Sequence, residues 1–506
     1  MNRIPSFKSR FAITLIANVV RGVVTLGLGV MLARLFGATD YGRIAFLLAT
    51  FMALKQLLDL GSSSAFYTLL SQQSRSGIFL LQFWFFFLGK YLLTAAVIFW
   101  VFPDSWVQSL WHGEQKSLVA LAMMATAMQF DMWPNAMQMP ESQRKTVKVQ
   151  PIYIGALLMQ VLSVAGLYWT NYLTLGNYLA SVAILWFFAA TLAAFLYEPE
   201  RDPEKFQNTK QTLREYIEFC KPIAPFLFVG FISDFLDRWM LQEWGGSQQQ
   251  GFLAISQQIS GVTLIITASI IKMVWKEVAE ALQRDDLESA KQIYMVTKKN
   301  MFLVGAFIAC GVIPWSEEVL RLVYGNEYIP AWGVLVAMMM YSIHQSLGQF
   351  EGAFIMASGK TRIGLIFNTA MIPFGPMVSY LLLSPTHLSE LLPPMGALGL
   401  ALKMVLFQIF SVNVIGVLIG KVFGWRHEWV YQLQTIAVLL SFGISVKMVI
   451  SVLPIAPLAA LISSVVVYGI VVCIAIVLYP RIFGFGQFVF ANGIKLKIKG
   501  VFNGVR

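Results

Sequence analysis

A succession of long apolar stretches constrains this chain more than any other feature. Each stretch holds about 20 mostly apolar residues, the length that an α-helix needs to cross roughly 30 Å of hydrocarbon. Lipid offers the backbone no hydrogen-bond partners, so each stretch is predicted to be a helix and the chain an all-α polytopic membrane protein. We predict about fourteen spans, at residues 12–36, 43–70, 79–102, 117–138, 149–169, 178–197, 222–242, 251–275, 301–321, 331–357, 363–383, 395–420, 431–453 and 457–480.

The composition excludes a soluble protein. Of the 506 residues, 57% are hydrophobic and 12% are charged, whereas about 25% of the residues in a soluble domain are charged. The mean hydropathy is +0.67. So few charged residues cannot coat a globule of this length, which excludes a soluble enzyme and a disordered chain.

The positions of Lys and Arg predict the orientation. With the N-terminus inside, the inner segments hold 26 Lys and Arg residues, whereas the outer segments hold only Lys116 and Arg321. Basic residues concentrate in cytoplasmic loops, so both termini are predicted to be cytoplasmic. The net charge of +11 therefore indicates contact with membrane lipids, and no nucleic-acid partner is predicted. The first apolar run continues to Phe36, which is too long for a cleavable signal peptide.

Three of the predicted cytoplasmic segments have sequence patterns that predict contact with the membrane surface. Residues 205–221 and 276–300 each place apolar residues on one helical face and charges on the other, which predicts amphipathic helices on the inner leaflet. Asp285 or Asp286 is a suitable N-cap before Leu287. The basic tail at 481–506 is expected to lie against anionic lipid. The three cysteines are far apart in sequence, so neither a disulfide framework nor a metal or other cofactor is expected.

An internal repeat predicts two lobes. A G-x4-G turn at 37–42 separates the first two spans, and a second one at 246–251 separates the seventh and eighth. The repeat predicts two pseudo-symmetric six-helix lobes around a central cavity, where transporters built from repeats bind their substrates. The predicted organisation is an N-terminal lobe (1–197), a cytoplasmic linker with an amphipathic helix (198–221), a C-terminal lobe (222–420), two additional helices (421–480) and a basic cytoplasmic tail (481–506).

Ionisable residues inside the spans are the candidate functional residues, because each costs about 2.5–3.5 kcal/mol to insert. Arg21, Lys55 and Lys272 lie away from the loops in spans one, two and eight, which are spans that bracket the repeated turns. A cavity lined by these three would attract a phosphate or a pyrophosphate. The candidate coupling or cavity charges are Asp59, Lys90, Asp131, Asp237, Arg238 and Glu351.

Pairing inside the membrane is the alternative for these charges. Lys55 and Asp59 are four residues apart on one helix and could neutralise each other. Asp237 and Arg238 point to different sides of their helix, so each needs another partner. His344 lies within a span and could serve a membrane acyltransferase, but a structural, hydrogen-bonded histidine is the simpler interpretation. No motif for nucleophilic or metal-dependent catalysis is present, which favours a transporter over an enzyme.

Several motifs, in order along residues 11–420, resemble the polysaccharide transporters. These Wzx-type flippases belong to the multidrug/oligosaccharidyl-lipid/polysaccharide (MOP) exporter superfamily. The similar segments are Ala33–Gly42 at the first outer turn, Lys221–Pro225 before span seven, Asp237–Leu241 within it, Trp275–Ala279, Tyr324–Tyr328 and Ser358–Thr361.

The resemblance implies a flippase in the bacterial inner membrane. It would move an undecaprenyl-pyrophosphate-linked oligosaccharide outward by alternating access, for O-antigen, capsule or exopolysaccharide assembly, beside partners such as a polymerase and a chain-length regulator. In the related lipid II flippases basic residues of spans one, two and eight line the cavity, and Arg21, Lys55 and Lys272 are the nearest counterparts here. A cation-coupled multidrug exporter of the same fold, a membrane-embedded glycan polymerase or acyltransferase, and a scaffold in glycan assembly are the alternatives.

Overall fold

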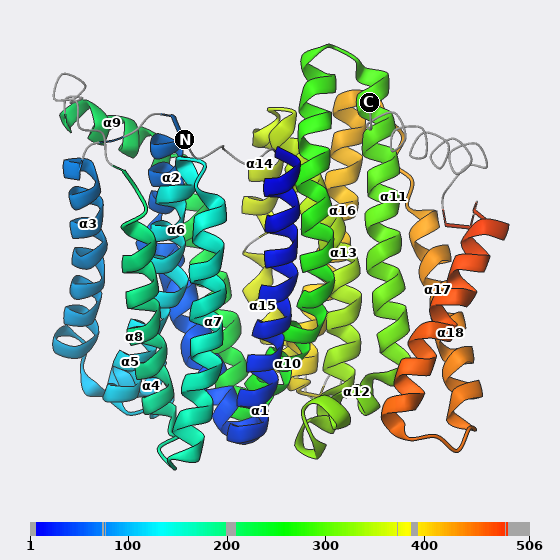
Figure 1. The fold of residues 1–506 in the computed structure, drawn as a ribbon, viewed down its shortest axis with the longest axis horizontal. Coiled ribbons are helices and arrows are strands. Elements are labelled where there is room, and N and C mark those ends of the chain that lie inside the picture. The colour runs from blue at the N-terminus through cyan, green and yellow to red at the C-terminus, as the bar shows by residue number, and fades with distance from the viewer. Residues whose placement is uncertain are drawn as a thin grey trace. The chain divides into compact units, whose positions relative to one another are not determined.

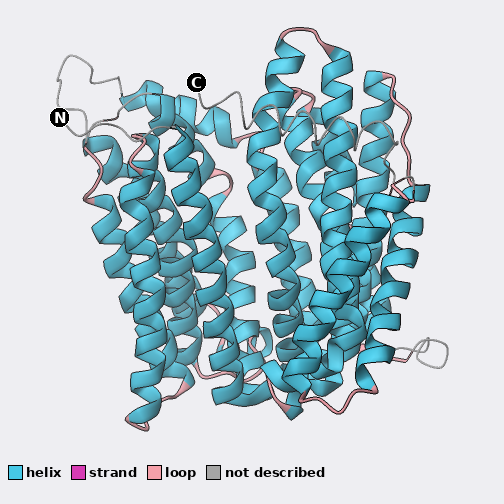
Figure 2. Ribbon diagram, turned by 45° about the vertical axis from the view of Figure 1, so that its right-hand side comes forward, coloured by secondary structure: helices cyan, strands magenta, loops and turns pink. Residues whose placement is uncertain are grey.

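Helices make up nearly all of the described chain (Figures 1 and 2). The structure is a computed structural model, and it describes residues 7–72, 75, 77–198, 209–371, 373–385, 393–480 and 482–483. No strand occurs within these ranges. Most of the predicted basic tail and the first part of the predicted linker lie outside them.

The first part of the chain, up to and including the helix of the linker, contains short and long helices with two π-helical segments. These elements are α1 (Phe7–Asp59), α2 (Ser62–Gln72), α3 (Gly77–Ala96), the π-helix η1 (Val97–Val101), α4 (Asp104–Leu110), α5 (Lys116–Thr126), the π-helix η2 (Ala127–Met132), α6 (Trp133–Ser142), α7 (Thr146–Trp169), α8 (Leu175–Ala194) and α9 (Thr209–Cys220).

The second part begins with the longest helix. Its elements are α10 (Ala224–Gln283), α11 (Leu287–Val312), the 3₁₀ helix η4 (Ile313–Trp315), α12 (Ser316–Val323), the 3₁₀ helix η5 (Asn326–Ala331), α13 (Trp332–Ala357), α14 (Thr361–Met371), α15 (Phe374–Leu383), α16 (Gly396–Phe423), α17 (Val430–Ser451) and α18 (Pro457–Leu478).

These elements confirm the all-α membrane fold, since every predicted span falls on helix. Within the described residues, eight helices are long and apolar enough to cross a membrane, or nine if the bent pair Thr212–Cys220 and Ala224–Thr267 counts as one span. One of the eight, Ala17–Asp59, overlaps two predicted spans, those at 12–36 and 43–70, because α1 runs through the first repeated turn.

The two repeated turns have the same backbone geometry. Gly37 has φ 71° and ψ 175°, and Gly246 has φ 75° and ψ 179°, values that break the helix and favour glycine. The last glycine of each motif serves close packing. A Cβ on Gly42 would overlap the carbonyl of Ser247, and one on Gly251 would overlap the carbonyl of Ala38. The repeat predicted from the sequence therefore brings its two copies into backbone contact.

The prediction of a separate surface helix at 276–300 is wrong. Residues up to Gln283 continue α10, and α11 begins at Leu287 and runs without a break into the next predicted span. No proline or glycine separates residues 287 and 304, so the amphipathic and apolar stretches form one helix. Of the two N-caps predicted, Asp286 is the one that forms, because its carboxylate accepts a hydrogen bond from the Ser289 amide at 3.0 Å.

The chain divides into two units. Unit 1 comprises residues 1–254 and 369–400, and unit 2 comprises residues 255–368 and 401–506. Unit 1 has a core of fully buried side chains that includes Phe46, Leu47 and Trp186. In unit 2, α11 packs on α13, and the buried Phe302 ring of α11 lies edge to face against the His344 ring of α13, with their centroids 5.7 Å apart. The boundaries predicted for the lobes remain predictions.

Candidate functional site

The candidate site lies in unit 1 around Asp131, whose side chain has no exposed surface. Asp131 sits in the π-helix η2, between α5 and α6. Pro134, at the start of α6, has no N–H to donate to the carbonyl four residues earlier, and this favours a wider turn at that place. A π turn rotates the following side chains relative to a regular helix, so it determines which neighbours Asp131 meets.

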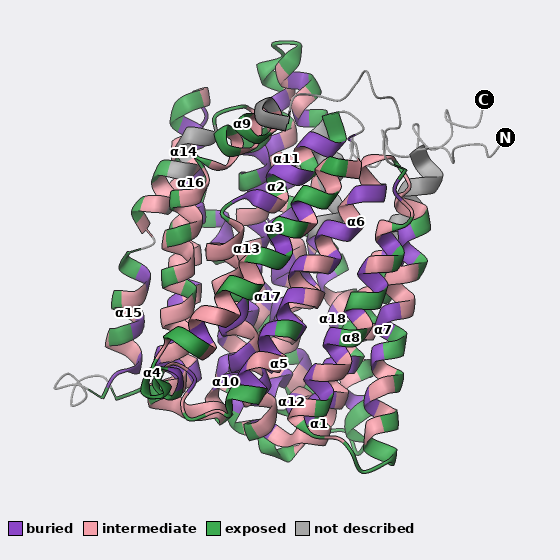
Figure 3. Cartoon of the chain, turned by 90° about the vertical axis from the view of Figure 1, so that its left-hand side faces the viewer, coloured by how far each residue is buried: buried purple, intermediate pink, exposed green. Residues whose placement is uncertain are grey.

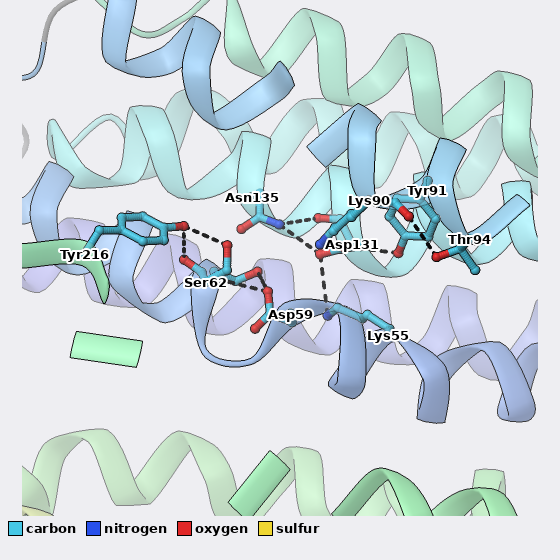
Figure 4. Close-up of polar contacts among 10 residues, drawn as sticks. Lys55, Asp59, Ser62, Lys90, Tyr91, Thr94, Asp131, Asn135 and Tyr216 are labelled. Carbon is cyan, nitrogen blue, oxygen red and sulfur yellow. Dashed lines mark hydrogen bonds and ion pairs between the residues drawn. The ribbon is translucent and has the colours of Figure 1, made fainter. Parts of the chain in front are cut away.

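Asp131 accepts contacts from three helices (Figure 4). The Lys90 Nζ on α3 lies 2.7 Å from Oδ2, and the Tyr91 hydroxyl donates to the same oxygen at 3.0 Å. Asn135, one turn away on α6, donates its amide to Oδ1 at 3.0 Å. On α1, the Lys55 Nζ lies 4.0 Å from Oδ1. One carboxylate therefore holds two ammonium groups at unequal distances.

The two lysines differ in exposure as well as in distance. The side chain of Lys90 is 8% exposed, whereas that of Lys55 is 27% exposed. Two ammonium groups around one carboxylate leave one positive charge. That charge belongs chiefly to Lys55, because its ion pair is longer and more accessible. The arrangement can attract an anion while Lys90 neutralises Asp131.

Asp59 contacts Ser63 rather than Lys55, the partner that the sequence analysis considered for it. The Asp59 Oδ1 accepts hydrogen bonds from the Ser63 amide at 3.0 Å and from the Ser63 hydroxyl at 2.5 Å. The adjacent Ser62 bonds to Tyr216 of α9, hydroxyl to hydroxyl, at 2.7 Å. The carboxylate that Lys55 approaches is therefore Asp131, and the polar groups form a row from α9 to α3, which Figure 4 shows.

Two members of the predicted basic triad lie in different surroundings from Lys55. The Arg21 guanidinium lies 4.4 Å from the centre of the Tyr153 ring on α7, a cation–π contact. Lys272 belongs to α10 within unit 2, and its side chain lies outside the described part of the structure. The structure brings together Lys55, Lys90 and Asp131 from the predicted residues, while a joint site for Arg21, Lys55 and Lys272 remains a prediction.

The other predicted charges contact their own neighbours. Asp237 accepts a hydrogen bond from the Ser379 hydroxyl at 2.6 Å. The Arg238 guanidinium donates to the side-chain Oε1 of Gln250 at 3.4 Å, and the side-chain Nε2 of Gln250 donates to the backbone carbonyl of Arg238 at 2.6 Å. These two residues thus have separate partners, as their opposite directions on the helix predict.

Glu351 belongs to a buried network that the sequence analysis missed. The Lys298 Nζ lies 2.8 Å from Glu351 Oε1 and 3.2 Å from His427 Nδ1. An ammonium has no acceptor, so His427 Nδ1 carries no proton and Nε2 donates to the Asn413 oxygen at 3.1 Å. Lys298 had been assigned to a cytoplasmic segment. The uninterrupted helical pattern from residue 287 onward is the signal that could have placed Lys298 within a packed helix.

His427 lies in the connection between α16 and α17. Burial and, to a smaller extent, the neighbouring Lys298 ammonium lower its pKa to about 4, while Glu428 acts in the opposite direction. His427 is therefore neutral at physiological pH, which agrees with its hydrogen bonds. Within the described residues no cluster of three or more metal-binding side chains occurs.

The arrangement of helices resembles solved transporter structures. The lipid II flippase MurJ, in an inward closed conformation, shares 14% identity over 90% of this chain and 97% of its own, with a TM-score of 0.64. An inward-facing multidrug resistance MATE family transporter shares 14% identity over 81% of this chain and 97% of its own, with a TM-score of 0.59. The chain has the fold of the MOP superfamily transporters.

A third transporter with this fold shares 12% identity over 82% of this chain and 92% of its own, with a TM-score of 0.52. It is a MOP superfamily transporter from Pyrococcus furiosus whose binding pocket is described as having reversed polarity. The sequence matches no protein-family model and no curated protein.

Proposed function

We propose that this protein is a flippase for an undecaprenyl-pyrophosphate-linked oligosaccharide in the bacterial inner membrane. Support comes from the fold, which it shares with MurJ, a lipid II flippase, and from the motifs that resemble the Wzx-type transporters. We further propose cytoplasmic termini, alternating access and cooperation with a glycan polymerase and a chain-length regulator. The positive charge on Lys55, which remains after Lys90 neutralises Asp131, supports an anionic substrate.

The observation that carries this proposal is the excess positive charge at Asp131. Lys90 neutralises that carboxylate at 2.7 Å, so the Lys55 ammonium, at 4.0 Å and 27% exposed, is available to another anion. A pyrophosphate carries its charge on oxygens that a lysine can approach as a point charge. Arg21 and Lys272 are proposed to contribute further positive charge, as the sequence predicts.

A multidrug exporter is the second candidate, favoured by the similarity to the MATE transporters. Exporters of cationic drugs require a negative potential in their cavities. Here the buried carboxylates of Asp131 and Glu351 each lie within 3 Å of a lysine ammonium, at 2.7 and 2.8 Å respectively. These ion pairs lower the attraction for a cation, so the lipid-linked anion is the better substrate.

A reconstituted system separates the two candidates. Undecaprenyl pyrophosphate carrying a fluorescent disaccharide is placed in both leaflets of proteoliposomes, and an impermeant quencher outside reports movement between them. We expect protein-dependent flipping that unlabelled undecaprenyl pyrophosphate competes away. Protein-free liposomes and uptake of the cation ethidium serve as controls. Ethidium transport without flipping would contradict the proposal.

A further inference from the structure

A hollow in unit 1 has no part in the proposed transport of the headgroup. It is a cavity of about 890 Å³ between the end of α1, one face of α3, the linker helix α9 and the beginning of α10. This volume lies in the range of sites that bind a single small ligand. Every lining residue belongs to unit 1.

The walls of the cavity are apolar and incompletely covered. Phe83 and Phe86 of α3 face it, together with Leu213 and Ile217 of α9 and Phe228 of α10. Leu213 is 58%, Ile217 55% and Phe228 47% exposed. Figure 3 shows exposed residues along α9. Apolar side chains that remain exposed beside a cavity mark a place where further apolar surface binds.

Fixed contacts keep the two walls apart. On one side Tyr216 ties α9 to α2, because its hydroxyl donates to the Ser62 carbonyl at 2.8 Å. On the other side the Phe83 ring of α3 stacks on Phe66 of α2, with their centroids 3.7 Å apart. Since both α9 and α3 are anchored to α2, α9 cannot close onto α3 without breaking a contact. The cavity is therefore suited to an occupant rather than to collapse.

Two opposite charges belong to the same cavity. Asp59, at the end of α1, and Lys221, directly after α9, both line it. Lys221 is exposed, and the Asp59 contacts described above involve only its Oδ1. A ligand with an apolar chain and one charge of each sign would satisfy all of these features. A zwitterionic phospholipid is such a molecule, and a primary ammonium, unlike a quaternary one, has N–H groups that can donate to the Asp59 carboxylate.

We propose that this cavity binds one phosphatidylethanolamine molecule of the surrounding membrane. An acyl chain fills the space between α3 and α9, the phosphate lies near Lys221, and the ammonium lies near Asp59. The lipid would hold α9 in place beside the polar row that leads to Lys55. This inference does not depend on the identity of the transported substrate.

Native mass spectrometry of the full chain released from detergent tests the proposal. The chain is titrated with phosphatidylethanolamine, phosphatidylcholine and phosphatidylglycerol that have identical acyl chains. We expect one tightly bound lipid, with phosphatidylethanolamine preferred over phosphatidylcholine by a factor of about three, as for a partly exposed ion pair. Ile217→Trp and Leu213→Trp, which fill the cavity, should each abolish this binding for all three lipids.

The headgroup variants and a control complete the design. Asp59→Asn should keep the bound lipid but lose the preference for phosphatidylethanolamine over phosphatidylcholine, whereas Lys221→Gln should weaken the binding of all three lipids, because each carries a phosphate. Leu458→Trp, at a residue of α18 that is 62% exposed, should behave like the wild type. Thermal unfolding identifies any variant that fails to fold. Undiminished binding in a folded Ile217→Trp or Leu213→Trp variant would overturn the cavity site, and a preference for phosphatidylglycerol would overturn the proposed occupant.

Discussion

Lys90 and Asp131 form a direct ion pair inside unit 1, with 2.7 Å between the ammonium nitrogen and the carboxylate oxygen. The second lysine near the same carboxylate, Lys55, lies at 4.0 Å and is more exposed. The unequal geometry assigns different tasks to two residues of the same type. Lys90 stabilises the buried aspartate, and Lys55 is the lysine that we propose to meet the substrate.

Replacing Lys90 by Met should destabilise the protein strongly, because it leaves Asp131 buried with a distant partner. Removing one member of a buried pair typically costs about 3–5 kcal/mol, whereas replacing both by apolar residues is often neutral. We therefore expect Lys90→Met to lose about this amount of stability and Lys90→Met/Asp131→Leu to regain most of it. Denaturant unfolding in detergent measures both, and equal losses in the single and double variants would contradict the assignment.

Because the two repeated turns touch at Gly42, alanine substitutions at two glycines of α1 should have different effects on stability. Gly42→Ala would place a Cβ onto the Ser247 carbonyl, while Gly27→Ala meets no atom within 4 Å. We expect Gly42→Ala to cost about 2 kcal/mol or more. Gly27→Ala should be neutral or stabilising by up to about 1 kcal/mol, because alanine has the higher helix propensity. Thermal unfolding of both variants checks this, and similar unfolding temperatures would refute the close approach.

His427 predicts a loss of stability in mild acid. Its pKa is about 4 in the folded protein against 6.5 for an unperturbed histidine, so the unfolded chain binds the proton first as the pH falls. The stabilisation is complete above about pH 6.5 and disappears progressively toward pH 4. His427→Gln can keep both hydrogen bonds without titrating, so its unfolding temperature should fall less than that of the wild type between pH 7 and pH 5. An equal fall in both proteins would exclude His427 as the cause.

The sequence was sufficient for the helices, the repeated turns and the Asp286 cap, because these depend on local patterns. It did not predict that Lys55 approaches Asp131. A regular helix favours the residue four positions away, Asp59, but Ser63 bonds to that carboxylate and the π turn at 127–132 brings Asp131 near instead. Lys298 was missed for a similar reason, since its charge suggested a loop whereas Glu351, 53 residues away in sequence, makes a buried position stable.

The most direct measurement is the affinity of purified variants for undecaprenyl pyrophosphate in detergent. Lys55→Gln should weaken binding by about 10- to 150-fold, since a hydrogen bond to a charged group contributes about 1.5–3 kcal/mol. Lys116→Gln, which removes a lysine paired with Asp104 instead, should bind like the wild type. Asp131→Asn leaves both lysines unneutralised and should bind at least as tightly, provided that it folds. Unchanged affinity in Lys55→Gln, or a loss in Asp131→Asn alone, would contradict the account.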